Sequence, residues 1–122
     1  MQKFMTLAAA ALLSAAGATA AFAHAELESS VPAANATVKT APATIEIDFS
    51  EELNAKLSKI EVQDSMGMQV DKGDSHVASD NEKHLSIGLK PLSAGTYKVI
   101  WTSVASDDGH KLTGTFSFTV QP

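Results

Sequence analysis

Apolar and polar residues alternate with a period of two along most of residues 24–122. This alternation is typical of strands that bury one face and leave the other in water. In the range 96–104, for example, Tyr97 and Trp101 fall on the face that we expect to be core. The predicted strands lie at residues 25–29, 44–49, 59–63, 85–89, 96–104 and 113–120.

The segments between these strands are rich in residues that form turns and break helices. Pro32 and Pro42 bracket a stretch that we expect to be an extended loop. Residues 71–83 are charged and rich in Gly, Ser and Asp, so they are also predicted to be a loop. Residues 50–54 form a polar connection with room for one helical turn. Short strands joined in this way predict an all-β fold, a single Greek-key β-barrel or antiparallel β-sandwich of the cupredoxin-like or immunoglobulin-like kind.

Residues 1–23 have a different pattern. Lys3 precedes an apolar run over residues 4–13, and small residues follow up to an A-x-A sequence at residues 21–23. These are the features of a secretory signal peptide, and the run is too rich in Ala and Gly for a membrane span. We therefore expect cleavage after the A-x-A sequence, export to the periplasm, and a mature domain at residues 24–122 that begins with His24.

Composition limits the function of this domain. The chain contains no cysteine, and its 14 acidic and 9 basic residues give a formal net charge of −5. The lack of cysteine excludes disulfides, thiolate ligands and thiol redox chemistry. The acidic balance, without a basic patch that contains aromatic residues, argues against a nucleic-acid partner. It suits a protein that handles cations.

Three residues carry candidate metal chemistry. Once cleavage exposes it, His24 offers an α-amine and an imidazole Nδ1 to the same ion. Asp108 and His110 are two residues apart, so in extended backbone both side chains leave on the same side. Three nitrogens and one carboxylate suit Cu(II), and Zn(II) can use the same donors in a tetrahedral set. Taken singly, each of these features is more often just a turn or an incidental histidine, and only the fold can bring residue 24 beside residue 110.

Three blocks of the sequence resemble the signature blocks of the CopC family of periplasmic copper-binding proteins. They read HAELESSVPAANATV, IEIDFSEEL and LSAGTYKVIWTSVASDDGHKLTGTFSFTV, in the order that the family has them. The family hallmarks are a mature N-terminal His with a Ser-x-Pro-Ala stretch, a Phe-Ser-Glu segment, and Gly-Thr-Tyr-x-Val-x-Trp leading to Ser-x-Asp-x-His. The resemblance covers residues 24–120 and implies a Greek-key β-barrel that takes part in copper resistance or copper homeostasis.

Carried over position by position, the resemblance implies a Cu(II) site made by His24, through its amine and Nδ1, with Asp108 and His110. Glu51, in the Phe-Ser-Glu block, would be a carboxylate that does not bind the ion itself but orients an imidazole ligand. The resemblance also implies a monomeric carrier or chaperone. Its delivery partners would be an inner-membrane copper transporter or a periplasmic copper oxidase.

A second, Cu(I) site is a further hypothesis. Some relatives hold Cu(I) in a methionine-rich loop, and the corresponding stretch here, SMGMQVDKGDSHV, contains Met66 and Met68, with His76 further on. Thioethers are soft ligands that select Cu(I). The alternative is that the Met-Gly-Met tip is simply turn and edge packing. Apart from this hypothesis, His76 and His84 are interpreted as surface loop histidines.

Two other functions fit parts of the sequence. An N-terminal histidine with a second imidazole is also the histidine brace of copper polysaccharide monooxygenases. Against that function, the chain has few aromatic residues for a flat polymer-binding surface, and Asp108 would crowd the position that dioxygen needs. The other alternative is an immunoglobulin-like structural module with incidental histidines. The resemblance favours a copper carrier that is not an enzyme.

Overall fold

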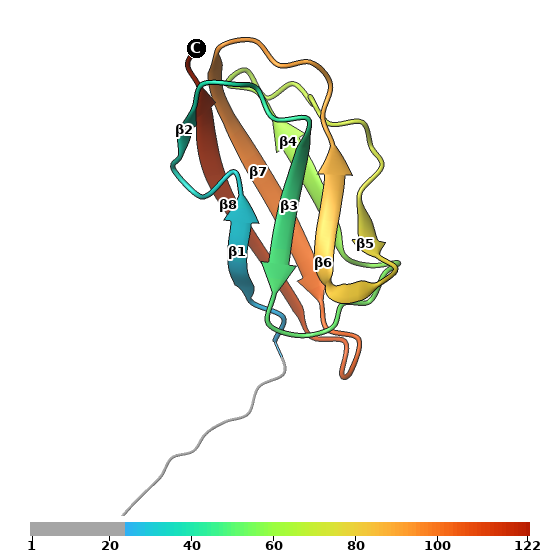
Figure 1. Ribbon diagram of the computed structural model, residues 1–122. Coiled ribbons are helices and arrows are strands. Elements are labelled where there is room, and N and C mark those ends of the chain that lie inside the picture. Colours follow the sequence, from blue (N-terminus) through green and yellow to red (C-terminus); the bar gives the residue numbers. More distant parts are fainter. Residues whose placement is uncertain (1–23) are drawn as a thin grey trace, which may run out of the picture.

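The computed structural model describes residues 24–122, which form two four-stranded β-sheets packed face to face (Figure 1). The expected signal peptide, residues 1–23, lies outside the described residues. Within residues 24–122 there are strands and turns but no helix, and so none that could cross a membrane. The strands are β1 (Leu27–Val31), β2 (Thr37–Val38), β3 (Thr44–Phe49), β4 (Lys59–Gln63), β5 (His76–Ala78), β6 (Asn81–Gly88), β7 (Gly95–Val104) and β8 (Lys111–Val120).

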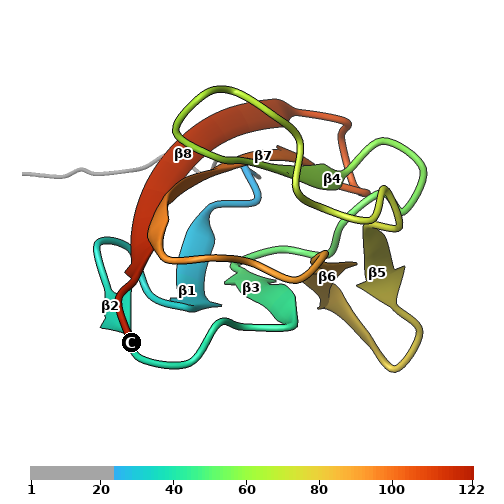
Figure 2. The same ribbon diagram turned by 90° about the horizontal axis from the view of Figure 1, so that it is seen from above.

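The two sheets have the orders β1-β3-β6-β5 and β2-β8-β7-β4. Neighbouring strands are antiparallel, except that the short β2 runs parallel to β8. Figure 2 shows the two layers facing each other across the core. The chain passes repeatedly from one sheet to the other, as in a Greek-key sandwich. The predicted all-β fold is therefore confirmed.

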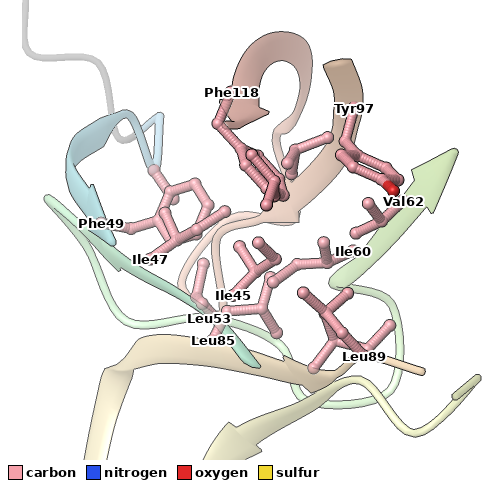
Figure 3. Packing of buried hydrophobic residues seen from close by; sticks show 14 of the residues in the cluster. Ile45, Ile47, Phe49, Leu53, Ile60, Val62, Leu85, Leu89, Tyr97 and Phe118 are labelled. Carbon is pink, nitrogen blue, oxygen red and sulfur yellow. The ribbon is translucent and has the colours of Figure 1, made fainter. Parts of the chain in front are cut away.

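The core lies between the sheets and is built from the alternating apolar positions (Figure 3). Ile45, Ile47 and Phe49 of β3 are buried, and so are their counterparts on β4, β6, β7 and β8. Each fully buried side chain of this size contributes roughly 1.5–3 kcal/mol relative to an exposed one. Of the predicted aromatic anchors, Tyr97 is buried in the core, and Trp101 is partly buried and packs against it. The Trp101 ring meets Phe49 edge-on at 5.3 Å between centroids, and Tyr97 stacks on Phe118 at 5.5 Å.

The loop prediction for residues 71–83 is wrong in part. The range contains β5 and the first residues of β6, which pair with each other. The alternation that indicates a strand is lost here, because β5 has no fully buried residue and residues 81–83 of β6 are all exposed. The helical turn expected within residues 50–54 instead begins at Asn54, whose carbonyl accepts the amide proton of Ser58 at 3.0 Å. Asn54 Oδ1 also accepts the amide protons of Lys56 and Leu57.

Asp71, which precedes β5, is a buried residue rather than a solvated loop residue. Its Oδ2 accepts the amide proton of Val62 in β4 at 2.7 Å. Its Oδ1 accepts the amide proton of Gly73 at 2.8 Å and the side-chain amide of Gln69 at 2.7 Å. One carboxylate therefore fastens the connection after β4 to the edge of its sheet.

We expect Asp71→Asn to lower the free energy of unfolding by about 1–3 kcal/mol, because in either orientation the new amide group faces an N–H donor. Denaturant unfolding of the mature domain measures this change. Asp80→Asn, in the exposed turn between β5 and β6, removes the same charge and should leave stability nearly unaltered. Equal unfolding midpoints for the two variants would contradict the structural role of Asp71.

Candidate metal centre

The fold brings His24 and His110 together at one end of the sandwich. β7 ends at Val104 and β8 begins at Lys111, and the corner between them carries Asp108 and His110. The described chain begins close to this corner, below β1 in Figure 1. The centroids of the His24 and His110 rings lie 4.8 Å apart, with an angle of 53° between their planes.

The corner itself is fixed by backbone hydrogen bonds. The Ala105 amide donates to the His110 carbonyl, and the Gly109 amide donates to the Ala105 carbonyl, both at 3.0 Å. Gly109 has a φ of 75°, in the left-handed region that glycine occupies without steric cost. Asp-Gly-His therefore lies in a tight turn, which holds the Asp108 and His110 side chains on one short loop.

Asp108 contacts His110 with both carboxylate oxygens. Oδ1 accepts the backbone amide proton of His110 at 3.0 Å, and Oδ2 lies 3.1 Å from the ring nitrogen Nδ1. A carboxylate in this position fixes the orientation of an imidazole, and a proton on Nδ1 leaves the lone pair on Nε2 for a metal. The two side chains are 38% and 55% exposed, so the corner is open to solvent.

The segment that carries His24 is anchored by two serines. The Ser50 hydroxyl donates to the His24 carbonyl at 3.2 Å and accepts the Glu26 amide proton at 2.9 Å. The Ser103 hydroxyl donates to the carbonyl of the buried Ala25 at 2.6 Å. Bonds from β7 and from the residue after β3 therefore fix the backbone from the His24 carbonyl to the Glu26 amide.

The side chains at this end do not form a closed metal-binding set. Among residues 24–122, no three His, Cys, Asp or Glu side chains are grouped so that they could hold a metal ion. The contacts at this end include His24 with His110 and Asp108 with His110. Imidazole nitrogen and carboxylate oxygen are donors that copper accepts, so the chemistry of the residues fits copper. A further donor would have to come from elsewhere, and the backbone nitrogen of a processed His24 is one.

Glu51 lies near this end, in the connection after β3. It lines a hollow of about 260 Å³ together with Glu52, Lys83, Ser106 and Asp107. The carboxylate that contacts an imidazole of the candidate centre is Asp108. Orientation of an imidazole by Glu51 stays a prediction.

The residues of the hypothetical Cu(I) site lie elsewhere. Met66 and Met68 are 85% and 64% exposed in the loop after β4. That loop lies at the opposite end of its sheet from the His110 corner, because Gln63 of β4 pairs with Lys98 of β7. His76 begins β5 in the other sheet, with Nδ1 3.0 Å from the Asp74 carbonyl oxygen. A Cu(I) site formed by these three side chains stays a prediction.

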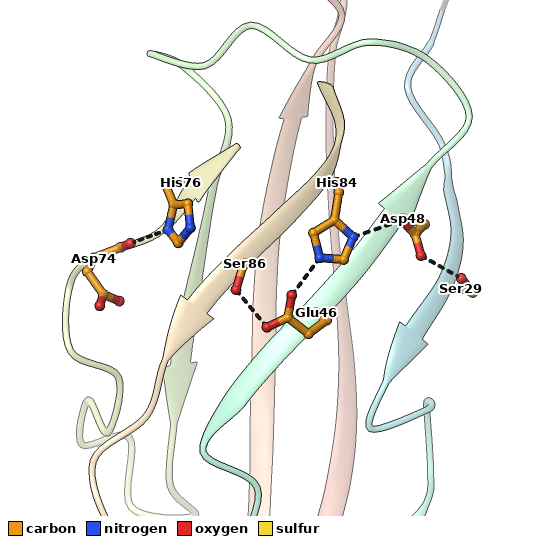
Figure 4. A network of polar contacts seen from close by, with 7 residues as sticks. All are labelled: Ser29, Glu46, Asp48, Asp74, His76, His84 and Ser86. Atoms are coloured by element: carbon orange, nitrogen blue, oxygen red, sulfur yellow. Dashed lines mark hydrogen bonds and ion pairs between the residues drawn. The ribbon is translucent and has the colours of Figure 1, made fainter. Parts of the chain in front are cut away.

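His84 was misinterpreted as a surface loop histidine, because it lies in β6 between two carboxylates (Figure 4). Its Nδ1 is 2.8 Å from Asp48 Oδ1, and its Nε2 is 2.5 Å from Glu46 Oε1. Ser86 donates to the other oxygen of Glu46 at 2.8 Å, and Ser29 donates to the other oxygen of Asp48 at 3.4 Å. The available signal was the polar face of the strand 44–49, where Glu46 and Asp48 alternate with core residues. It could not be used without the register between β3 and β6.

This network moves the pKa values of His84 and Glu46 in opposite directions. Hydrogen bonds to Asp48 and then to Glu46 raise the pKa of His84, and partial burial opposes the shift. Burial on its own raises the pKa of Glu46, but hydrogen bonds from His84, Ser86 and Thr44 outweigh it, so the pKa of Glu46 lies below its ordinary value. A protonated His84 donating to two carboxylates is therefore the favoured state.

Comparison with known proteins yields one consistent family. The family model described as "CopC domain" matches residues 27–121. The chain is 40% identical over 111 residues to copper resistance protein C of Escherichia coli, covering 85% of this chain and 86% of that protein. It is 34% identical over 100 residues to copper transport protein CutJ of Bacillus subtilis, but it spans only 18% of the length of that protein.

A solved structure agrees with the sequence comparison. The crystal structure of PcoC, described as a methionine-rich copper resistance protein from Escherichia coli, superposes with a TM-score of 0.69. The two chains are 40% identical, and the match covers 81% of this chain and all of PcoC, 100%.

The His84 network predicts a stability that depends on pH. Because the pKa of His84 is raised in the folded state, its contribution is complete below about pH 6.5 and is lost as the pH rises through the folded pKa. The contribution of Glu46 is also stabilising but has the opposite pH dependence, because it is lost as the pH falls through the lowered pKa of the folded state. Thermal melting should show His84→Gln to be less stable than the wild type at pH 6, by less than about 1 kcal/mol given the solvent exposure, with a smaller gap at pH 9. His76→Gln is the control, and an equal gap at both pH values for His84→Gln would refute the assignment.

Proposed function

This chain belongs to the CopC family, and from that premise we propose that its mature form is a periplasmic protein that binds Cu(II) and carries or buffers it for copper resistance or uptake. The observation that carries the proposal is the 4.8 Å contact between the rings of His24 and His110, which lie at the start and near the end of the domain. The printed names of the relatives, copper resistance and copper transport proteins, support copper as the cargo.

The proposed ligands are the α-amine and Nδ1 of His24, an imidazole nitrogen of His110 and the carboxylate of Asp108. Cleavage after Ala23 converts the amide nitrogen of His24 into an amine, whose ordinary pKa is about 7.7–8.0. A metal must displace that proton near neutral pH, so affinity falls in acid. His110 would offer the nitrogen that does not face Asp108, and binding by Asp108 requires Oδ2 to turn from the ring to the ion. A nitrogen-rich set of this kind favours Cu(II).

The same features favour a carrier over an enzyme. Asp108 and His110 are 38% and 55% exposed on a corner that extends from the end of the sandwich. A bound ion there can be passed to an incoming partner by ligand substitution, without a redox step. The proposed recipients are an inner-membrane copper transporter or a periplasmic copper oxidase.

His110→Ala in the mature protein should weaken Cu(II) binding by more than about 100-fold, because it removes a ligand and the group that Asp108 orients. The Cu(II) EPR spectrum should lose the coupling from one imidazole nitrogen. His76→Ala is the matched control, since His76 is also an exposed histidine and contacts a backbone carbonyl. If the spectrum of His110→Ala were unchanged, His110 would not be a ligand.

A mature protein that retains Ala23 tests the role of the amine. The added residue turns the His24 nitrogen back into a peptide amide, so Cu(II) affinity should fall by at least about 10-fold while the melting temperature stays the same. Competition with a coloured Cu(II) chelator measures both forms. Equal affinities would remove the amine from the proposed ligand set.

A further inference from the structure

We propose that Ser103 is a positioning residue of the Cu(II) site, whose hydroxyl fastens the mature N-terminal segment to β7 and so sets His24 against His110. The proposal rests on the proposed function, because it concerns the same site. It assigns to Ser103 a role that its place in a core strand does not suggest.

The hydrogen bond that carries the proposal is short and fully buried. The Ser103 hydroxyl donates to the Ala25 carbonyl at 2.6 Å, and both residues have 0% of their surface exposed. A carbonyl removed from water needs a donor from the protein, and here a side chain far along the chain supplies it. Without that hydroxyl, the buried Ala25 carbonyl would have lost its donor, and movement toward water would let it form a hydrogen bond again. His24, the residue directly before Ala25, would then move with it.

Ser103 also belongs to the strand that leads into the His110 corner. It pairs with Leu112 of β8, two residues beyond His110. Ala105, two residues after Ser103, donates its amide proton to the His110 carbonyl at 3.0 Å. The anchor of the N-terminal segment and the base of the corner are therefore parts of one rigid pair of strands.

This arrangement matters because His24 is the first residue of the mature chain. Chain ends are poorly ordered unless they are tied down, and ordering a loose end on binding lowers affinity. Ser50 ties the same segment from the partly exposed side, through the His24 carbonyl and the Glu26 amide. Ser103 ties it from the interior, one residue from the proposed chelating histidine.

Ser58 provides a matched control for loss of a buried serine hydroxyl. It is 4% exposed, and its Oγ accepts the amide proton of Val104, the residue after Ser103, at 3.0 Å. Its hydroxyl lies 3.4 Å from the Val104 carbonyl oxygen. Ser58 thus bonds to the same strand at the same end of the sandwich, but to β7 itself and not to residues 24–26.

The experiment compares mature wild type, Ser103→Ala, Ser58→Ala and His110→Ala. Both serine variants should lose thermal stability to a similar extent. Only Ser103→Ala should also weaken Cu(II) binding, by at least about 10-fold, and alter the Cu(II) EPR spectrum. In the copper-free protein, only Ser103→Ala should speed hydrogen exchange at the Glu26 amide. Ser103→Thr, which keeps the hydroxyl, should restore Cu(II) affinity.

The outcomes separate this proposal from the proposed function. If His110→Ala loses Cu(II) while Ser103→Ala keeps wild-type affinity, spectrum and Glu26 exchange, the role of Ser103 is overturned and the carrier function stands. Equal loss of affinity in Ser58→Ala would reduce the effect to general stability and also overturn it. A wild type that binds no Cu(II) would overturn both proposals. If Ser103→Ala does not fold, Ser50→Ala tests the same anchoring, and unchanged Glu26 exchange and affinity there would count against it.

Discussion

Burial of the facing apolar sides of two sheets is the constraint on which the rest of this structure depends. There is no cysteine and therefore no disulfide, so core packing, together with hydrogen bonds, must fix the relative positions of the strands. Phe49 and Trp101 illustrate how it does so, because they meet edge-on from different sheets. Close packing of this kind makes the strands rigid, and the strand ends then become fixed points from which short loops extend.

His84 and His110 differ in their surroundings, because one lies within a strand and the other on a loop beyond the strand ends. His84 lies within a strand, and each of its ring nitrogens contacts a carboxylate, so its hydrogen-bonding capacity is used inside the fold. His110 lies on a loop beyond the strands, more than half exposed, with one ring nitrogen facing Asp108. The first environment stabilises a sheet surface, whereas the second leaves imidazole chemistry open to a ligand. Since both residues are histidines, the structural histidine and the candidate ligand are distinguished by their solvent exposure and by how many of their ring nitrogens contact a carboxylate.

The two places suited to copper by donor type lie at opposite ends of one sheet. The imidazoles and Asp108 are at the corner between β7 and β8, whereas Met66 and Met68 project from the loop after β4. Nitrogen and carboxylate donors favour Cu(II), and thioethers favour Cu(I). Because the length of the sheet separates the two places, their side chains cannot bind the same ion. Any site at the methionine loop would therefore be independent of the histidine corner.

The sequence by itself determined the all-β class, several strand ranges and the core faces, because period-two burial and turn chemistry are local properties. The ranges of β3 and β4 follow from alternation alone, whereas β5 has three residues, none of them fully buried, and left no such pattern. The sequence also singled out His24, Asp108 and His110 as residue types, but it had no means of placing the first beside the last. Only the tertiary structure decided that pairing, the contact of His84 with Glu46 and Asp48, and the anchoring of Ala25 by Ser103. The physical reason is that each depends on strand register and sheet order, which are set by packing between segments distant in the chain.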